Sequence, residues 1–319
     1  MDPITHGLIG AALATAAGHP AQLSDPVFLG STLGAMLPDL DIVAHLKGRL
    51  NYLLKHRGAS HSLIALGGMA VGLSTVLYGL YPSTSWNTIF FWTLAGTLSH
   101  GIVDLLNSFG AELLWPFIRR KLTVDMIMLT DPVVFTLFLV ALATAMYNPE
   151  AAQTASLAAF LFSGLYLGHR ALGRKHLCDQ LLQIYHLTDK KNIKVLPAMY
   201  RPFSWNFLIL QDHLIRFGTV RRGKPEIRHV WPQYDSNDPA VAAALDGNVA
   251  EVFSRFTPYY HVVAETPQDG AGTVEFLDLR YWNKDDFLYT GRVMVNDSGE
   301  IARETFHSYR DEEGTVLSY

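Results

Sequence analysis

A chain of 319 residues is long enough for two domains, and its formal net charge of −4 gives no electrostatic reason to expect nucleic acid as a partner. Charged residues make up 17% of the chain, below the roughly 25% of a typical soluble protein, and they are sparse between residues 63 and 167. The single cysteine, Cys178, excludes a disulfide framework and a zinc site built from thiolates.

The chain opens with two short apolar stretches, residues 7–17 and 27–37. Asp2 or Thr5 can cap the first of them, and Pro3 suits a first helical turn. Each stretch is shorter than the roughly 20 residues that span a bilayer. We therefore predict two short helices that either dip into a membrane as a hairpin or are buried among longer helices.

Four longer apolar stretches follow, and each is typical of a transmembrane helix. They cover residues 63–81, 86–106, 129–147 and 151–168. Membrane helices of this kind pack against one another through small residues, which are frequent here. The alternative is a large soluble helical bundle whose core helices are apolar.

The positions of Lys and Arg predict how these helices cross the membrane, because short positive loops stay in the cytoplasm. Lys and Arg occur in residues 47–57, in residues 107–125 and after residue 170, whereas the loop 81–85 has none. The alternation predicts that the basic segments and the C-terminal part of the chain are cytoplasmic.

Residues 169–191 repeat apolar side chains at helical spacing, which predicts an amphipathic helix along the membrane surface. From residue 207 short β-branched and aromatic segments alternate with turn residues, as in antiparallel strands. The predicted strands are 207–220, 259–265, 273–282, 287–295 and 301–309, with a helix at 239–253.

The predicted fold is a mainly α membrane-embedded helical bundle followed by an α+β domain with an antiparallel sheet. The bundle has about four transmembrane helices and two short N-terminal ones. We predict a membrane domain at residues 1–170, an amphipathic connection at 171–199 and a cytoplasmic domain at 200–319.

Histidine and aspartate side chains gather at one membrane face in this topology, near the cytoplasmic ends of the helices. They are His6, Asp39, Asp41, His56, His61, His100, Asp104, Asp125 and Asp131. Ionisable residues at hydrocarbon depth in a membrane are costly, so such a gathering within apolar helices indicates a functional site. His100 and Asp104 are four residues apart on one helix, a spacing that lets two side chains contact one ion.

Taken singly, these residues also have ordinary structural interpretations. The His100–Asp104 pair fits a simple hydrogen bond, and Asp131 fits a helix N-cap that precedes proline. Residues 38–41 fit a turn that ends a helix, and residues 56–62 fit a hydrated basic loop.

Together the set supplies four histidines and five carboxylates, more than one tetrahedral site needs. We predict one or two divalent ions, Zn²⁺ first, with Mn²⁺ or Fe²⁺ as alternatives. Such a centre activates water, with Asp125 or Asp131 as the predicted general base. Arg57, Ser60 and Ser62 are placed to contact an anionic oxygen such as that of a phosphate, although Arg57 also fits an ordinary positive-inside residue.

Four motifs in this order resemble a known family. They are Met-Asp-Pro-Ile-Thr-His at 1–6, Pro-Asp-Leu-Asp at 38–41, His-Arg-Gly-Ala-Ser-His-Ser at 56–62, and His-x-x-x-Asp at 100–104 followed by Asn-Ser-Phe-Gly at 107–110. Over roughly residues 1–135 the chain is similar to bacterial inner-membrane metal-dependent hydrolases. The last helix motif is also similar, as a fold-level analogy, to zinc-dependent phospholipase C and P1 nuclease.

The resemblance implies a hydrolase whose metal ligands are His6, Asp39, Asp41, His56, His61, His100 and Asp104. Asn107, in the fourth motif, joins Arg57, Ser60 and Ser62 as a predicted substrate contact. The same resemblance implies a location in the bacterial inner membrane.

The sequence thus predicts an integral membrane hydrolase with a cytoplasmic metal centre and a lipid-derived or phosphoester substrate, because two-metal centres suit displacement at phosphorus. Carboxyl ester or amide hydrolysis and a non-catalytic metal-binding membrane scaffold are the alternatives. The expected partners are the lipid bilayer and an amphiphilic small molecule, with no nucleic acid. The substrate, the metal, the oligomeric state and the role of residues 200–319 do not follow from the sequence.

Overall fold

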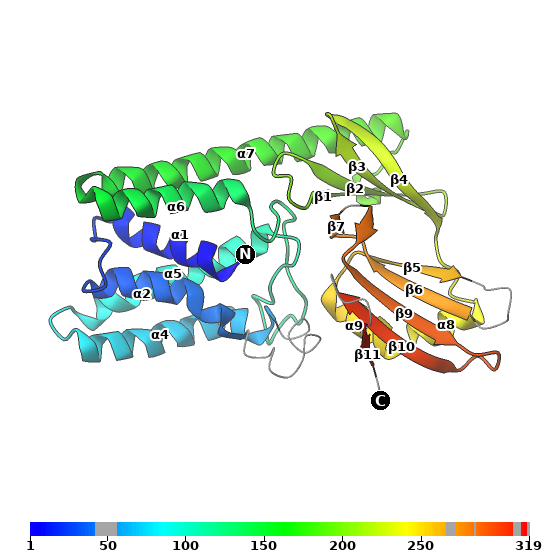
Figure 1. The fold of residues 1–319 in the computed structure, drawn as a ribbon, viewed down its shortest axis with the longest axis horizontal. Helices are drawn as coiled ribbons and strands as arrows, with labels where there is room; N and C mark the ends of the chain where they lie inside the picture. Colours follow the sequence, from blue (N-terminus) through cyan, green and yellow to red (C-terminus); the bar gives the residue numbers. More distant parts are fainter. Residues whose placement is uncertain (42–55, 266–271, 284, 309–313, 318–319) are drawn as a thin grey trace. The chain divides into compact units, whose positions relative to one another are not determined.

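The computed structural model describes residues 1–41, 56–265, 272–283, 285–308 and 314–317. It divides into two compact units, Met1–Gly173 and Arg174–Tyr319, and helix α7 (Ala152–Ile184) carries the chain from the first into the second (Figure 1). Residues 47–55, whose basic side chains contributed to the predicted orientation, lie outside the described residues.

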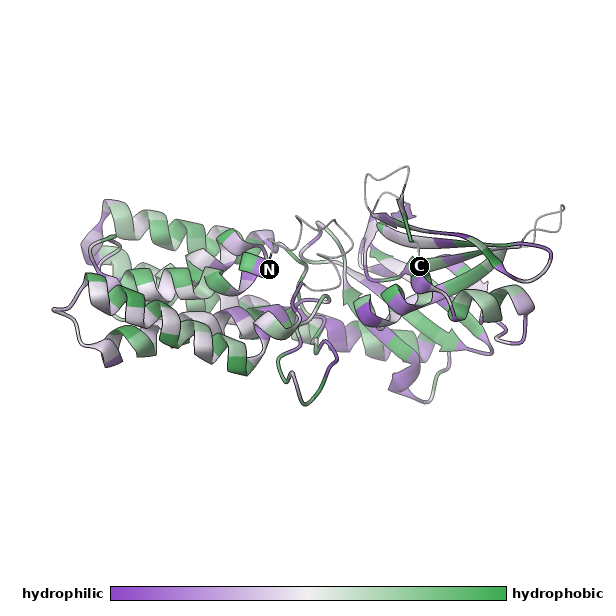
Figure 2. Ribbon diagram, turned by 90° about the horizontal axis from the view of Figure 1, so that it is seen from below, coloured by the Kyte–Doolittle hydropathy of each residue, from purple (hydrophilic) through white to green (hydrophobic). Residues whose placement is uncertain are grey.

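The N-terminal unit is helical. Besides α7 it contains α1 (Pro3–Ala16), α2 (Pro26–Met36), η2 (Ala59–His61), α4 (Leu63–Leu80), α5 (Trp86–Leu106), α6 (Pro132–Tyr147) and η3 (Pro149–Ala151). Helix α1 packs against α2, α5 and α6, and α5 also packs against α2 and α4. Figure 2 shows apolar residues along much of the length of these helices.

By length and composition, three helical stretches of the described residues are able to cross a membrane: α4, α5 and Pro149–Ile184, which contains α7. The predicted span at residues 129–147 corresponds to α6, which has only 16 residues. Its length of about 24 Å is less than the roughly 30 Å of a hydrocarbon core. Helix α6 is shorter than the apolar stretch because its N-cap is Asp131.

Several helices begin at an Asp-Pro pair. The carboxylates of Asp2, Asp25, Asp131 and Asp238 each accept a hydrogen bond from a backbone N–H of the first turn. Proline follows each aspartate, at a position where the helix needs no N–H donor. These caps fix where the helices start, and in α1 the cap places His6 near the beginning of the helix.

Helix α2 lies very close to α1 and α5, because glycines face it from both. A β-carbon added to Gly10 of α1 would lie 2.5 Å from the Ser31 carbonyl oxygen, and one added to Gly96 of α5 would lie 2.2 Å from the same oxygen. The Ser31 hydroxyl donates a hydrogen bond of 2.7 Å to the Gly10 carbonyl. This packing brings the segment that follows α2 close to α1 and α5.

The C-terminal unit contains two larger antiparallel sheets and a small one. The four-stranded sheet has the order β1 (Ile193–Pro197), β2 (Trp205–Gln211), β3 (Leu214–Arg221), β4 (Lys224–Pro232). The five-stranded sheet has the order β11 (Thr315–Val316), β10 (Ile301–Ser308), β9 (Tyr289–Val295), β6 (Gly272–Asp278), β5 (Tyr260–Glu265). In the small sheet, β7 (Trp282–Asn283) pairs with β8 (Asp286–Phe287). The helical elements are η4 (Lys190–Asn192), α8 (Pro239–Leu245) and α9 (Asn248–Phe256).

Helices α8 and α9 pack on the five-stranded sheet. The ring of Phe253 on α9 lies 5.5 Å from that of Phe276 on β6. A second apolar cluster joins Leu277 of the same strand with Leu208 and Phe217 of the four-stranded sheet. The five-stranded sheet therefore contributes to two apolar cores.

The predicted fold class is confirmed: a helical N-terminal half with membrane-spanning candidates precedes an α+β part with antiparallel sheets. The predicted strand 207–220 is in fact the hairpin of β2 and β3. Its turn lies at Asp212 and His213, whose φ angles of 54° and 58° suit a tight hairpin. Alternating apolar residues on both sides of the turn concealed it.

Two predicted helical stretches also differ from the structure. The helix predicted at 239–253 is broken between α8 and α9 at Gly247, where a β-carbon would lie 2.5 Å from Glu304 Oε1. Conversely, residues 152–184 form the single helix α7 where two helices were predicted. Strands β1 and β4 were not predicted.

Candidate metal centre

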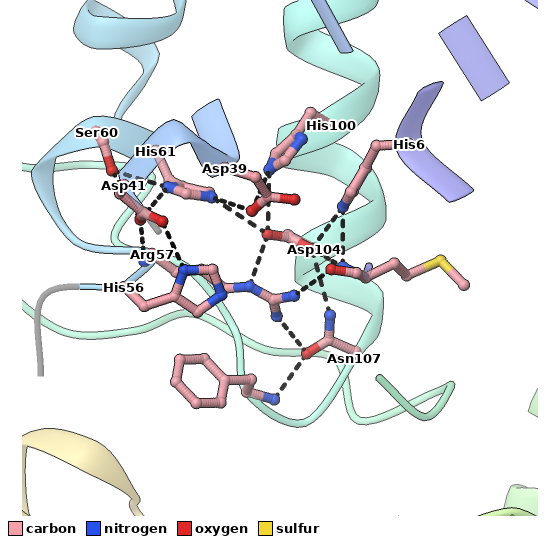
Figure 3. Close-up of polar contacts among 12 residues, drawn as sticks. His6, Asp39, Asp41, His56, Arg57, Ser60, His61, His100, Asp104 and Asn107 are labelled. Carbon is pink, nitrogen blue, oxygen red and sulfur yellow. Dashed lines mark hydrogen bonds and ion pairs between the residues drawn. The ribbon is translucent and has the colours of Figure 1, made fainter. Parts of the chain in front are cut away.

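Seven histidine and aspartate residues come together in the N-terminal unit (Figure 3). They form three overlapping groups, each with ligand atoms within 4.8 Å of one another: His6–Asp39–His100, His61–His100–Asp104 and Asp39–Asp41–His56. We call these seven residues the His/Asp cluster. They are the seven ligands that the family resemblance implied, and they come from α1, α5 and the two segments at residues 39–41 and 56–61.

Asp104 lies at the centre of the buried part of the cluster. Its Oδ1 is 3.2 Å from His6 Nε2, and its Oδ2 is 3.4 Å from His100 Nε2 and 3.6 Å from His61 Nε2. The Asp39 Oδ1 atom is 3.6 Å from the same nitrogen of His61 and 3.7 Å from that of His100. All five side chains are at most 5% exposed.

Several atoms of this buried part make no hydrogen bond. They are His6 Nδ1, both carboxylate oxygens of Asp39, and the Nε2 atoms of His61 and His100. Buried polar atoms are nearly always hydrogen-bonded, and leaving one without a partner costs about 1–3 kcal/mol. The atoms therefore need a partner of another kind.

The spacing of these atoms fits a metal ion. Two ligand atoms of a tetrahedral ion, each about 2.1 Å from it, lie about 3.4 Å apart. The nitrogen–oxygen distances of 3.4 to 3.7 Å around His61 and His100 are close to that value and are longer than a good N–H···O hydrogen bond. The buried histidines and aspartates of this structure could hold a divalent cation.

The tautomer of His100 supports this interpretation. Its Nδ1 lies 2.7 Å from the backbone carbonyl oxygen of Ala35. A carbonyl oxygen only accepts, so Nδ1 carries the proton and Nε2 of the neutral ring presents a lone pair toward Asp39 and Asp104. A backbone carbonyl that fixes the ring in this way is a common feature of metal-ligating histidines.

Asp41 and His56 form the outer, partly exposed part of the cluster. His56 Nδ1 lies 2.8 Å from Asp41 Oδ1, and the other oxygen of Asp41 accepts hydrogen bonds from the Arg57 backbone N–H and the Ser60 hydroxyl. Ser60 also lies 3.0 Å from His61 Nδ1, so it links the outer and inner parts.

The protonation states expected in this environment suit metal binding. Burial lowers the pKa of both His56 and His61, despite the neighbouring carboxylates, so the neutral rings are favoured. Burial by itself raises the pKa of Asp39 and Asp41, but the nearby histidines outweigh it and the pKa of each carboxyl falls below its usual value. Neutral imidazoles and ionised carboxylates are the forms that bind metal.

Arg57 is buried inside the site. Its Nε lies 2.9 Å from Asp104 Oδ2, and its two Nη groups donate to the Asn107 side chain at 2.8 Å and to the Met1 carbonyl at 3.0 Å. The ring of Phe109 lies 5.2 Å from the guanidinium. Arg57 thus neutralises and orients Asp104, a contact that sequence reasoning missed because the backbone φ of +59° that directs the side chain is not visible in the sequence.

The other predicted substrate contacts have structural partners. Asn107 accepts the bond from Arg57 and another from the Phe109 N–H at 2.8 Å. Ser62 caps α4 by accepting a bond from the Ala65 N–H at 3.2 Å. Their contact with a substrate stays a prediction.

The α-amino group of Met1 also lies in the cluster, which sequence reasoning did not predict. It forms an ion pair with Asp104 Oδ1 and lies 2.9 Å from His6 Nε2. Burial, with the nearby Arg57 guanidinium, lowers the pKa of this amine to about 6, so near neutral pH its uncharged form predominates.

The two predicted general bases lie outside the three groups of ligand atoms. Asp131 caps α6 and accepts a hydrogen bond of 2.8 Å from the Tyr166 hydroxyl. Asp125 has a φ of 54° and accepts a bond from Thr123 Oγ1 at 3.1 Å. The role of either residue as a general base stays a prediction, and the alternative interpretation of Asp131 as an N-cap is what the structure shows.

Comparison with known proteins places this site in a family. Residues 1–177 match the YdjM inner membrane protein family, and residues 239–314 match the YfhP C-terminal alpha/beta plait domain. Over 304 residues the chain is 28% identical to the uncharacterised protein YfhP of Bacillus subtilis (strain 168), an alignment that covers 92% of this chain and 91% of that protein. No solved structure matches the chain.

The first match covers more than half of the chain and includes all seven residues of the His/Asp cluster. It confirms the predicted resemblance, and with the apolar helices it supports a location in a membrane. The chain therefore belongs to the YdjM inner membrane protein family, a metal-dependent-hydrolase-like group.

Proposed function

We propose that this protein is an integral membrane hydrolase that depends on one or two divalent cations, Zn²⁺ first, held by the His/Asp cluster. The observation that carries the proposal is the group of buried imidazole and carboxylate atoms that lie 3.4 to 3.7 Å apart. Within this group, Asp39 Oδ1 and the Nε2 atoms of His61 and His100 make no hydrogen bond. Nitrogen and oxygen ligands without sulfur suit Zn²⁺, Mn²⁺ or Fe²⁺.

A bound divalent cation supplies Lewis acidity and lowers the pKa of water. The chain's own residues prepare the site for it. The Ala35 carbonyl accepts from His100 Nδ1 and so orients the ring with Nε2 toward Asp39 and Asp104, and Arg57 holds Asp104 in one orientation. The surrounding apolar helices keep bulk water away from the inner part, which strengthens electrostatic interactions there.

The outer part of the cluster is where a substrate would approach. Asp41 and His56 are 11% and 12% exposed, whereas the inner residues are at most 5% exposed. An approach from this side brings the reacting bond to Asp41 and His56 first. Arg57 is committed to Asp104, so its part in the reaction is to position that carboxylate.

The proposed substrate is a lipid-derived or otherwise amphiphilic phosphoester. His100 and Asp104 lie in the last two turns of α5, a helix able to span a membrane, so the cluster lies near one end of the span. In the segment after α5, exposed Phe117 and Ile118 precede exposed Arg119 and Arg120. Apolar and basic side chains in this order suit contact with lipid tails and headgroups.

The proposed location is the bacterial inner membrane with several spans, and with the cluster and the C-terminal unit on the cytoplasmic side. The basic residues 119–121 and 170–175 support this orientation, because positive segments stay in the cytoplasm.

A non-catalytic metal site is a second candidate, and the burial of the cluster favours it. The inner five residues are nearly inaccessible, as in closed structural sites that leave no position for water. In that case the metal would stabilise the helical unit without supporting turnover.

The test compares two histidine variants of the full chain purified in mild detergent. His61→Ala removes a member of the cluster, whereas His19→Ala removes a histidine that pairs with Asp25 and does not belong to it. Metal content is measured together with hydrolysis of a chromogenic phosphodiester, a phosphomonoester and a carboxyl ester, with and without phospholipid.

We expect the wild type and His19→Ala to hold metal and to hydrolyse a phosphoester, and His61→Ala to lose both. Metal in the wild type without hydrolysis of any substrate would favour the structural site. Metal content and hydrolysis that are both equal in His61→Ala and the wild type would contradict both candidates.

A further inference from the structure

The C-terminal unit contains a polar cavity of about 290 Å³ that has no part in the site described above. It lies against β2, β3, β4 and β7 and the segment that joins β1 to β2. The lining residues that matter here are Arg201, Asn206, Arg221, Arg228 and Trp282. All of them belong to the unit Arg174–Tyr319.

The cavity is positively charged. Three arginines line it, against the single carboxylate of Asp285 among the described residues. Two of the donor groups of Arg228 already have partners: Nε donates to Thr219 Oγ1 at 3.1 Å, and Nη2 pairs with Glu226 at 3.1 Å. Within the described part of the chain, the side chains of Arg201 and Arg221 enter no ion pair. Guanidinium groups are suited to bind oxyanions with two parallel hydrogen bonds.

A buried amide in the same cavity lacks a partner. Asn206 is 2% exposed, and its Nδ2 makes no hydrogen bond. It stands on β2 opposite Thr219 of β3, and both residues line the cavity. A buried amide N–H without a partner lowers the stability of the folded protein by about 1–3 kcal/mol. A ligand oxygen that accepts from Asn206 Nδ2 would remove this penalty.

From these observations we propose that the cavity binds a phosphate group of a small molecule. A phosphate offers several acceptor oxygens and a double negative charge, which matches free arginine donors and an unpaired amide N–H in one cavity. The Trp282 side chain, which also lines the cavity, provides an apolar surface for the remainder of the ligand. None of the cavity residues belongs to the His/Asp cluster, so phosphate binding here can be tested independently of the proposed hydrolase activity.

The experiment is isothermal titration calorimetry of the full chain in detergent at low salt, with inorganic pyrophosphate as the probe and acetate as the comparison. Arg221→Gln is paired with Arg222→Gln, its neighbour in the β3–β4 turn, which does not line the cavity. Both side chains are exposed, so neither change is expected to disturb folding. His61→Ala is titrated in parallel to remove binding at the His/Asp cluster.

We expect pyrophosphate binding in the wild type and in His61→Ala, an affinity about tenfold lower in Arg221→Gln, and no change in Arg222→Gln. Asn206→Leu is expected to unfold at a higher temperature than the wild type without ligand and to lose the stabilisation that pyrophosphate gives. No binding to the wild type, an equal loss in both arginine variants, or binding lost in His61→Ala would overturn the proposal.

Discussion

At the scale of single residues, the hydrogen bond between His100 Nδ1 and the Ala35 carbonyl is informative because it determines which ring nitrogen faces the cluster. The interaction of Arg57 with Asp104 is similarly specific, with three groups on one buried guanidinium. Each of these contacts can be tested separately from metal binding itself.

Replacing Arg57 by methionine leaves the Asp104 carboxylate buried with less positive charge around it. We expect Arg57→Met to lower the stability of the metal-free protein by about 3–5 kcal/mol, because removal of one partner of a buried ion pair has about that cost. A bound cation compensates the same carboxylate, so the loss should be smaller with saturating Zn²⁺. Thermal unfolding with Zn²⁺ and with a chelator measures the difference.

Arg120→Met is the control for this comparison. Arg120 is exposed, and its replacement should change stability by less than about 0.5 kcal/mol in either condition. An equal loss for Arg57→Met with and without metal would show that Asp104 does not face a bound cation.

Acidification should destabilise the metal-free protein. Burial holds the pKa of His56 and His61 below the ordinary value of 6.5, so the unfolded chain binds more protons than the folded one below that pH. The contribution of these two histidines to stability is fully present above pH 6.5 and is lost as the pH decreases through 6.5 toward their folded-state pKa. The lowered pKa of Asp39 and Asp41 acts in the same direction, below their ordinary 3.8.

Unfolding midpoints of metal-free wild type and His56→Gln, measured from about pH 8 to about pH 5, check this dependence. The variant lacks one of the titrating rings, so its midpoint should fall less. A midpoint that rises on acidification, or an identical fall in both proteins, would contradict the proposed environment of these histidines.

At the scale of elements, the close contact of α2 with α1 and α5 positions Asp39, which follows α2. We expect Gly96→Ala to cost about 1–3 kcal/mol, since the new methyl group meets the Ser31 carbonyl, and to weaken metal binding because α2 must move. Gly72→Ala, on α4 with no atom within 4 Å of an added β-carbon, should leave metal binding unchanged. Metal titration of the two variants measures this difference. Equal metal affinity in both would show that the packing of α2 does not position Asp39 for metal binding.

Asp131 starts α6, and its replacement distinguishes a helix cap from a general base. Asparagine caps helices about as well as aspartate, so a purely structural Asp131→Asn should retain both metal and turnover. If Asp131 is a general base, Asp131→Asn should retain metal and lose turnover. If Asp131 is a metal ligand, the variant should lose metal. Because the N-cap and Tyr166 account for both carboxylate oxygens, we expect the first result, measured as metal content and hydrolysis rate.

Some elements could be predicted from the sequence because their signals are local. Asp-Pro pairs mark helix starts, and long uncharged stretches mark α4 and α5. The β2–β3 turn and the break at Gly247 escaped prediction for a different reason. The first depends on positive φ angles at Asp212 and His213, and the second on contact with Glu304, which is distant in sequence.

At the scale of the whole molecule, the seven residues of the His/Asp cluster could be named from motifs because each motif has a recognisable spacing. Their mutual distances could not, since four separate segments meet only through the packing of α1, α2 and α5. The part of Arg57 and the Met1 amine in the site follows from that packing. The cavity beside Asn206 depends instead on the pairing of β2, β3 and β4 in the C-terminal unit.

The proposed orientation can be measured with cysteines placed at two exposed positions in a Cys178→Ser background. Ser83 lies in the loop between α4 and α5, and Arg120 lies in the basic segment after α5. A membrane-impermeant maleimide applied to intact cells should label Ser83→Cys, and should label Arg120→Cys only after permeabilisation. The reverse pattern would place the cluster outside the cytoplasm.

The most direct measurement of the central claim is X-ray absorption spectroscopy on the full chain loaded with Zn²⁺, together with metal stoichiometry. The account predicts one or two bound ions per chain, a first shell of nitrogen and oxygen at about 2.0–2.1 Å with no sulfur, and imidazole scattering that weakens in His100→Ala. A folded wild-type protein that retains no divalent ion, or a zinc site unchanged in His100→Ala, would contradict it.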